Sequence, residues 1–248
     1  MKKLYILCIA ILATVAVACS GDGDNPNSEG TKGDGAGGSL AIFALKGNYL
    51  YTVDQQNLNV FSLVDATGPV KVNEVHIGFN IETLFSDQDY LYVGSQNGMY
   101  IYAISNPENP VFVSEAQHFT SCDPVVSNGT HAFVTLHSNT WCGNNINALM
   151  VYDLANPQVP QLIHHRELTA PKGLGLYNNY LFVCDDEIKV FDVTNPAEPV
   201  LVTSINKLCF DVIIRDNELF AIGADAVSRY ALNPEDITDI NLQSQVVF

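Results

Sequence analysis

The chain has 248 residues, of which 47% are hydrophobic and 15% are charged, and its formal net charge at pH 7 is −16. This apolar composition excludes a disordered chain and is sufficient for a sizeable core. The excess of carboxylates argues against nucleic-acid binding, which needs Lys and Arg to displace counterions, and against docking on anionic lipid through basic patches.

The N-terminal segment predicts export and lipidation. Lys2 and Lys3 precede an apolar run over residues 4–18, which is shorter than the ~20 residues of a membrane span and is typical of a signal peptide. Small residues end the run before Cys19, as in a bacterial lipobox, although Ala16 stands where Leu is commoner. We expect residues 1–18 to be removed and Cys19 to carry lipid, which would anchor the protein in the cell envelope, on the outer membrane. An ordinary signal peptide with an incidental Cys19 is the alternative.

Residues 19–39 are expected to form a flexible acidic tether after the lipidated cysteine. Residues 20–39 include seven glycines and have almost nothing to bury. The root-mean-square reach of such a coil is about 25 Å. The globular head is then expected over residues 40–248.

An internal repeat of about 42 residues organises the head. The first recurring group resembles Tyr-Leu-Phe, and its middle residue recurs at steps of 41, 41, 49 and 38 residues from Leu50 to Leu219. A second apolar group follows each time, over residues 58–63, 99–104, 149–154, 188–193 and 227–232. Both groups are rich in β-branched and aromatic residues, which favours strands.

A turn and a further apolar group complete each unit. The turn is Asn-Pro-x-x-Pro at residues 106–110, 156–160 and 195–199, with a degenerate form at 67–69 and only Asn233-Pro234 in the last unit. Asn before Pro opens a turn because Pro fixes φ and excludes its predecessor from the helical region. Extended groups follow at residues 70–72, 111–113, 161–163, 200–202 and 238–240, and a short strand precedes each unit, for example over residues 40–45 and 212–214.

Each unit therefore predicts four short antiparallel strands, and no segment has a sustained helical period. Four-stranded units of this length are typical of propeller blades, in which neighbouring sheets pack face to face around a ring. We predict an all-β fold, a five-bladed β-propeller with four short antiparallel strands per blade. An open β-solenoid or a large sandwich is the competing architecture.

The repeat resembles the LVIVD repeat of bacterial β-propeller surface proteins. Residues 180–202 are the closest copy, with a Tyr-Leu-Phe-Val strand, a Val-Phe-Asp-Val strand and Asn-Pro-x-x-Pro-Val-Leu-Val. Units one and five depart from the pattern at the turn. The resemblance implies a propeller on an exported, often lipid-anchored protein, and it implies no established activity.

Four cysteines remain in the head, an even number that predicts disulfides in an oxidising compartment. Cys122 and Cys142 are expected at the same end of one hairpin, which favours their pairing. Cys184 ends a strand of blade four near the start of blade five, so Cys184–Cys209 would be a cross-blade bridge. Two free buried thiols are the alternative to these bridges.

An insertion in blade three, residues 137–147, contains the only tryptophan. Loops at this end of a propeller converge near the channel mouth, and an exposed Trp could stack on a sugar or anchor a partner. Alternatively, the Trp folds over a disulfide and caps the blade. The candidate binding residues are Trp141, His137, Asn139, Asn144, Asp123, Glu82 and Asp211.

Catalytic and metal signatures are weak. No phosphate loop, dinucleotide fingerprint or hydrolase elbow occurs, and the six histidines lack metal-ligand spacing. The acidic run over residues 185–187 is expected to be a solvated turn rather than a calcium loop. We expect no cofactor, no metal and no assigned catalytic residue.

Three functions compete. The first is a non-enzymatic binding or scaffolding module with a protein or glycan ligand at one propeller face. The second is a glycan-processing enzyme, which needs two carboxylates facing each other across a cleft. Its candidates at the channel mouth are Glu82, Asp123, Asp185, Asp211 and Asp225. The third is a part of an envelope assembly machine that accepts strands at an uncovered propeller edge.

Overall fold

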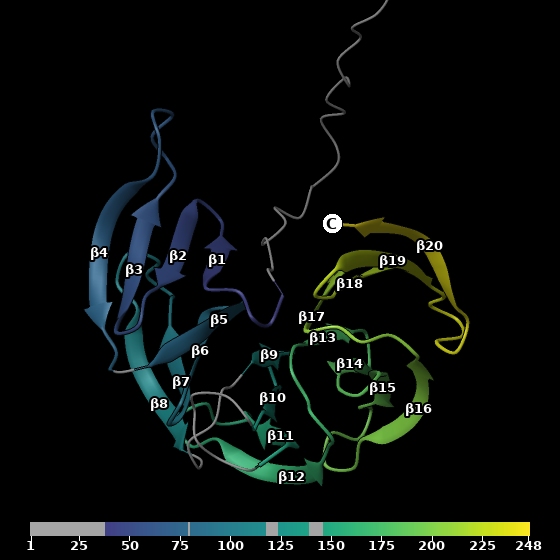
Figure 1. Ribbon diagram of the computed structural model, residues 1–248. Coiled ribbons are helices and arrows are strands. Elements are labelled where there is room, and N and C mark those ends of the chain that lie inside the picture. Colours follow the sequence, from purple (N-terminus) through teal and green to yellow (C-terminus); the bar gives the residue numbers. More distant parts are fainter. Residues whose placement is uncertain (1–37, 79, 118–123, 139–145) are drawn as a thin grey trace, which may run out of the picture. The chain divides into compact units, whose positions relative to one another are not determined.

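The computed structural model describes residues 38–78, 80–117, 124–138 and 146–248, all within one unit of the chain, residues 34–248. These residues form twenty β-strands in five four-stranded antiparallel sheets (Figure 1). They contain no helix that could cross a membrane. The prediction of an all-β, five-bladed propeller with four strands per blade is confirmed.

Each blade is built from four strands that are consecutive in the chain. Blade 1 contains β1 (Phe43–Lys46), β2 (Tyr49–Val53), β3 (Asn57–Ser62) and β4 (Val70–His76). Blade 2 contains β5 (Ile81–Asp87), β6 (Tyr90–Ser95), β7 (Gly98–Ala103) and β8 (Val111–Gln117). Blade 3 contains β9 (Val125–Ser127), β10 (His131–Leu136), β11 (Ala148–Asp153) and β12 (Gln161–Glu167). Blade 4 contains β13 (Leu174–Tyr177), β14 (Tyr180–Cys184), β15 (Ile188–Asp192) and β16 (Val200–Ile205). Blade 5 contains β17 (Asp211–Arg215), β18 (Glu218–Ile222), β19 (Ala226–Leu232) and β20 (Ile240–Val247).

The first strand of each blade is the innermost. Neighbouring first strands contact one another from β1 to β17, and Figure 1 shows them closest to the centre of the blade series. We call this centre the hub. Loops that precede the first strands therefore reach the hub, whereas β4, β8, β12, β16 and β20 form the outer edges.

The prediction was wrong at two strand ends. β1 begins at Phe43 rather than at Leu40 because the residues before it are bonded to blade 5 at the hub. β20 begins at Ile240 rather than at Thr238 because the N–H and hydroxyl of Thr238 both donate to the Asp236 carboxylate in the preceding turn. In both places a polar contact, with distant Asp211 in the first and with neighbouring Asp236 in the second, outweighs the β propensity of the segment.

The core lies between the blades. Successive side chains of a strand point to opposite faces of its sheet, so each blade can pack on both neighbours. In blade 2, Leu91 and Val93 pack toward blade 1, whereas Tyr92 packs toward blade 3. Four hydrophobic clusters join blade 1 to 2, 2 to 3, 3 to 4 and 4 to 5. Each fully buried large apolar side chain stabilises the fold by roughly 1.5–3 kcal/mol.

A β-bulge occurs at the same place in every blade, between the third and fourth strands. In blade 2, Ile101 pairs with Ser114 and Tyr102 pairs with Phe112, so Val113 is the extra residue. A bulge bends its strand and increases the twist, and Val113 packs against the cluster shared with blade 3. The bulge explains the second apolar residue of the Val-x-Val group. Its counterparts are Val72, Ile163, Val202 and Gln243.

The Asn-Pro turns connect neighbouring blades. The Tyr51 hydroxyl in blade 1 donates a hydrogen bond to the Pro107 carbonyl in the turn of blade 2, at 2.8 Å. The Arg166 guanidinium in blade 3 donates to the Pro199 carbonyl in the turn of blade 4, also at 2.8 Å. The turn of each later blade thus contacts the blade before it, and the degenerate turn at residues 67–69 belongs to the blade that has no predecessor.

Blades 1 and 5 share no hydrophobic cluster in the described part of the chain, and no strand of one packs broadly on a strand of the other. Residues 38–41 link them at the hub instead. Ser39 and Leu40 bind Asp211 of β17, and the Ala41 carbonyl accepts the N–H of Leu84 in β5. The described residues thus show face-to-face packing at four interfaces between blades, and at the fifth they show the polar contacts of residues 38–41.

Candidate binding site

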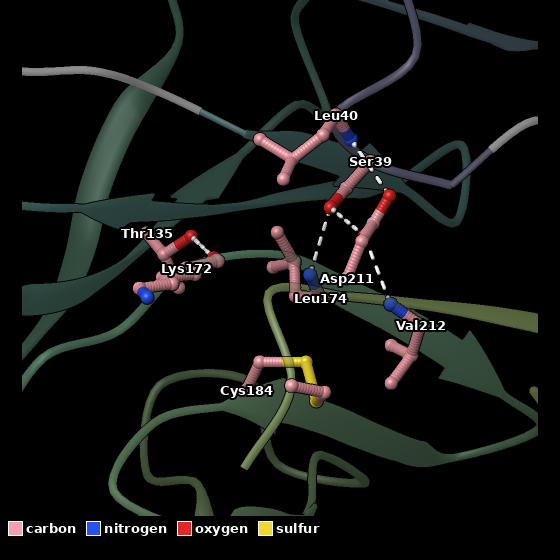
Figure 2. Close-up of a disulfide and its surroundings, with 9 residues drawn as sticks. Ser39, Leu40, Thr135, Lys172, Leu174, Cys184, Asp211 and Val212 are labelled. Atoms are coloured by element: carbon pink, nitrogen blue, oxygen red, sulfur yellow. Dashed lines mark hydrogen bonds between the residues drawn. A yellow bond between two sulfur atoms is a disulfide. The ribbon is translucent and has the colours of Figure 1, made fainter. Parts of the chain in front are cut away.

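A polar network at the hub is built around Asp211, the first residue of β17 (Figure 2). Its carboxylate accepts hydrogen bonds from the Ser39 hydroxyl at 3.0 Å, from the Leu40 N–H at 3.3 Å and from the Val212 N–H at 2.9 Å. The Ser39 hydroxyl also accepts a hydrogen bond from the N–H of Leu174 at 2.8 Å. The start of the head is thereby bonded to the starts of blades 4 and 5. We call this network the hub latch.

Two glycines make space for the Asp211 side chain. A Cβ added at Gly173 would lie 2.2 Å from Oδ1 of Asp211 and 2.7 Å from its Cα, and one added at Gly38 would lie 2.0 Å from Oδ2. The contact with the Asp211 backbone cannot be relieved by a side-chain rotation. Gly173 is therefore required for the close approach of β13 and β17, a role that the sequence pattern did not reveal.

Two hub carboxyl groups have raised pKa values. Burial raises the pKa of Asp211 above its ordinary value of 3.8, and the hydrogen bonds from Leu40, Ser39 and Val212 oppose this rise. Burial also raises the pKa of Glu82 in β5, against the hydrogen bond that Gln96 donates to it at 3.3 Å. A raised pKa suits a general acid. The oxygens of Asp211, however, are already bonded to donors of the protein itself.

A pocket of about 290 Å³ lies at the junction of blades 4 and 5. Its lining includes the apolar side chains of Leu208 and Phe210, which are 71% and 39% exposed, and the charged residues Lys172 and Asp185. The lining of this pocket thus combines exposed apolar side chains with charged ones. Such a surface can hold a small ligand or the side chain of a partner.

A disulfide between Cys184 and Cys209 supports this pocket. It joins the end of β14 to the loop before β17, with the two Cα atoms 5.6 Å apart. Figure 2 shows it beside the hub latch. This is the cross-blade pair that the repeat positions indicate. The other expected pair, Cys122 and Cys142, lies outside the described residues.

The acidic run after β14 is not a fully solvated turn, which corrects the expectation. Asp185 is only 4% exposed, and it accepts hydrogen bonds from the backbone N–H groups of Thr169 and Ala170. Lys189 contacts both Asp185 and Asp186, and its hydrogen bond lowers the pKa of Asp186. The described residues contain no cluster of three or more His, Cys, Asp or Glu side chains placed to hold a metal ion.

A second pocket, of about 410 Å³, lies beside the insertion of blade 3. It is lined by Ile146, Asn147, His165, Glu167 and Leu168. Four candidate binding residues fall outside the described part of the chain, namely Asp123, Asn139, Trp141 and Asn144. The structure therefore places this pocket next to the insertion and leaves the role of its tryptophan as a prediction.

His137 is the candidate from the insertion that the structure describes. It is half-buried, and burial lowers its pKa. The positive charge of Lys172 lowers the pKa further, whereas the negative charge of Asp185 opposes the shift. The pKa of His137 therefore depends on the same charged pair, Lys172 and Asp185, that lines the smaller pocket. Asp225 is exposed on the loop before β19 and lines neither pocket.

Sequence reasoning missed Ser39 and Lys172. The sequence pattern places Ser39 in the tether because it follows a Gly-rich segment. Its partner Asp211 is a candidate in the sequence because it is one of the carboxylates expected at the channel mouth. Lys172 had no motif around it. Its backbone carbonyl accepts a hydrogen bond from the Thr135 hydroxyl, a contact that joins residues from different blades and has no local signature.

Comparison with known families and structures supports the repeat and the fold. A model of the LVIVD repeat matches residues 37–69, 87–117 and 172–207, which correspond to blades 1, 2 and 4. The chain therefore carries LVIVD repeats. A search of the curated proteins finds no significant match.

Three solved structures illustrate the likeness. A periplasmic gluconolactonase of Pseudomonas aeruginosa has a TM-score of 0.61 at 14% identity, over 81% of this chain and 68% of that chain. A chain of the mitotic checkpoint complex has a TM-score of 0.59 at 12% identity, over 81% and 61%. A computationally designed protein has a TM-score of 0.57 at 13% identity, over 82% and 60%. This chain thus spans about 60% of the designed protein, and these likenesses show the fold alone.

Proposed function

We propose that the protein is a lipid-anchored module of the cell envelope that binds a partner protein at its outer blade edges and catalyses no reaction. The observation that carries this proposal is the exposure of apolar side chains after the Asn-Pro turns. Val111 and Phe112 in β8 are 62% and 52% exposed, and Val200 and Leu201 in β16 are 56% and 47% exposed. Exposed apolar residues that recur on several strands are typical of an interaction surface.

The outer strands also present open backbone groups. β8 and β16 are each the last strand of a sheet, and no other described strand pairs with their outer side. An extended segment of a partner can add to such an edge through main-chain hydrogen bonds, while apolar side chains supply contact area. A protein segment in an extended conformation is therefore the ligand that this surface fits best.

Photo-crosslinking of the full chain in its envelope tests the proposal. A photoreactive amino acid at Phe112, on β8, should give discrete adducts with a partner protein. The same amino acid at Gln55, an exposed loop residue between β2 and β3, is the matched control and should give none. Equal labelling at both positions, or none at Phe112, would contradict binding at the outer edge.

A glycan-processing enzyme is the second candidate, because burial raises the pKa values of both Asp211 and Glu82. Neither residue lines either of the two described pockets. An enzyme of this kind would lose turnover of a fluorogenic glycoside in the Asp211→Asn variant while remaining folded. We expect the unaltered chain to show no such turnover.

The anchor has its own test. If Cys19 carries lipid, Cys19→Ala should move the head from the membrane pellet to the soluble fraction, because two or more acyl chains are what makes anchoring stable. Ser20→Ala is the matched control and should stay in the pellet. Retention of Cys19→Ala in the pellet after a high-salt wash would refute lipidation.

A further inference from the structure

Among the residues that the structure describes, two sheet faces, one on blade 1 and one on blade 5, are not covered by a neighbouring blade as the other faces are. The front face of blade 1 is the side turned away from blade 2, and it consists mainly of Phe43, Leu45, Leu50, Thr52, Asn59 and Phe61. The back face of blade 5 is the side turned away from blade 4. It includes Ile213, Phe220, Ile222, Val227 and Arg229, with Glu218 and Ser244 on the same side. None of the four interblade clusters contains a residue of either face.

The front face uses positions that are fully buried in the other blades. Leu50 is half-buried, whereas its counterparts in the next four blades are 0% exposed, namely Leu91, Ala132, Leu181 and Leu219. Phe43 is 45% exposed, whereas Val125 and Leu174, at the same position in blades 3 and 4, are 0% exposed. Blade 1 therefore carries, on its front face, the apolar residues that form an interblade contact elsewhere, and no described blade covers them.

The back face shows the same contrast. Val227 is half-buried, whereas its counterparts in the preceding blades are all 0% exposed, namely Leu58, Met99, Leu149 and Ile188. Phe220 occupies the position of Tyr51 in blade 1 and Phe182 in blade 4, which are also 0% exposed. Blade 5 therefore ends the series with an apolar face of the type that packs on the next blade.

Every internal interface joins the back face of one blade to the front face of the next, and the chain leaves one face of each kind unmatched. We infer that the back face of blade 5 in one copy packs on the front face of blade 1 in a second copy. The contact is head-to-tail, so it uses different patches on the two copies and leaves one free patch on each end of a dimer. This inference does not depend on the function proposed above.

The hub latch makes a second copy the better occupant than the chain's own opposite end. Ser39 is 1% exposed, and it is bonded to both Asp211 and Leu174. Residues 38–41 thus lie where β17 would otherwise contact β1, as neighbouring first strands do elsewhere. With residues 38–41 bonded there, β1 and β17 do not make the broad contact that joins the other neighbouring first strands.

Arg229, a charged residue on the back face, also has a contact partner in the proposed head-to-tail arrangement. Arg229 replaces the aliphatic residue found at this position in the other blades and pairs with Glu218 at 3.3 Å. An arginine over an aromatic ring already occurs inside the chain, where the guanidinium carbon of Arg166 in blade 3 lies 5.1 Å from the ring centre of Phe191 in blade 4. Phe61 occupies the position of Phe191 in blade 1, so it presents an aromatic ring to Arg229 of a second copy, with Arg229 on the third strand of its blade where Arg166 is on the fourth.

Sedimentation velocity of the full chain in detergent micelles tests the inference, from about 1 to 100 μM protein. We expect reversible association that strengthens with salt, because a net charge of −16 opposes contact between copies at low ionic strength. Phe43→Glu, on the front face, and Val227→Glu, on the back face, should each weaken association about tenfold or more. Val159→Glu is the control, because Val159 is 57% exposed in the turn before β12 and belongs to neither face.

Mixing the two variants gives the decisive result. Each variant retains one intact face, so the mixture should form one-to-one dimers and no larger species, although neither variant associates alone. If a glutamate variant unfolds by circular dichroism, Phe43→Ser and Val227→Ser replace the pair. A monomeric wild type over the whole concentration range, unchanged association of the variants, or failure of the mixture to dimerise would each overturn the inference.

Discussion

Asp211 is the residue at which three segments of the chain converge. Its side chain receives donors from Ser39, Leu40 and Val212, and Gly173 leaves the space that it occupies. A buried acceptor that loses its partners costs more than the bond contributes when it is made. The hub latch is therefore more sensitive to substitution than its small number of hydrogen bonds would indicate.

Replacing Asp211 with alanine should destabilise the protein by about 2–4 kcal/mol, because the Ser39 hydroxyl and two N–H groups would lose their acceptor in a buried place. Urea unfolding of the full chain measures this loss. Asp225→Ala removes an exposed carboxylate near the same end of blade 5 and should change the unfolding free energy by less than about 0.5 kcal/mol. Equal effects of the two substitutions would contradict the role of the latch.

The raised pKa of Asp211 also predicts a pH dependence. Burial disfavours its charged form in the folded state, so the folded protein binds more protons than the unfolded chain between the ordinary pKa of 3.8 and the raised one. The stability contributed by this group is present below pH 3.8 and is lost as the pH rises through the folded pKa. Asp211→Asn cannot titrate, so the stability of the wild type relative to this variant should decrease with increasing pH. A relative stability that increases over the same range would contradict the raised pKa.

Two tyrosines of β2 offer a matched pair at the interface of blades 1 and 2. The Tyr51 side chain is fully buried, and its hydroxyl donates to the Pro107 carbonyl, whereas Tyr49 is half-buried and its hydroxyl donates to Glu108 at 3.0 Å in an exposed contact. Tyr51→Phe should cost about 0.5–1.5 kcal/mol in urea unfolding, and Tyr49→Phe should cost close to nothing because water replaces its partner. A larger loss for Tyr49→Phe would show that the turn is held differently.

The four-stranded blade is the element that repeats, and its two special features are the bulge and the Asn-Pro turn. The bulge turns Val113 toward the next blade, and the turn of the next blade accepts hydrogen bonds in return. Both features thus serve the contact between blades rather than the sheet in which they occur. The bulge lacks this role in blade 5, where Gln243 stands at the bulge of β20, and the turn lacks it in blade 1, where residues 67–69 are degenerate.

The Cys184–Cys209 disulfide joins two of these elements across a loop with a sequence separation of 25. In the chain-entropy account, a crosslink over such a loop stabilises the folded state by about 3 kcal/mol. The double variant Cys184→Ala/Cys209→Ala should therefore melt at a clearly lower temperature, and a reducing agent should affect it less than the wild type. A variant that melts like the oxidised wild type would show that the bridge adds no stability.

The blades could be predicted from the sequence because each is local. A strand, a turn and their spacing recur within 38–49 residues, and hairpins need only neighbours in the chain. The contacts of Asp211 could not be predicted, since Ser39 lies 172 residues away and belongs to a Gly-rich segment without pattern. The proximity of Lys172 and His137 could not be predicted either, because it results from the packing of separate blades.

At the scale of the whole molecule, the described residues pack blade on blade at four interfaces, whereas those of blades 1 and 5 share no hydrophobic cluster. The sequence pattern predicts the number of blades but not this difference, because every unit carries nearly the same apolar positions. The exceptions are few and lie on the end faces, where Thr52 and Arg229 stand at positions that are aliphatic in the other blades. They could be recognised only after the register of every strand was known.

All strands of a sheet come from one continuous stretch of chain, since no blade borrows a strand from another. Gene segments that encode one unit can accordingly be duplicated or deleted without cutting a hydrogen-bonded ladder. A sixth unit inserted after Ile205 would have the back face of blade 4 on one side and the front face of blade 5 on the other, and could pack on both. Because each unit is a self-contained sheet, the number of units in such a chain can change without disrupting the remaining sheets.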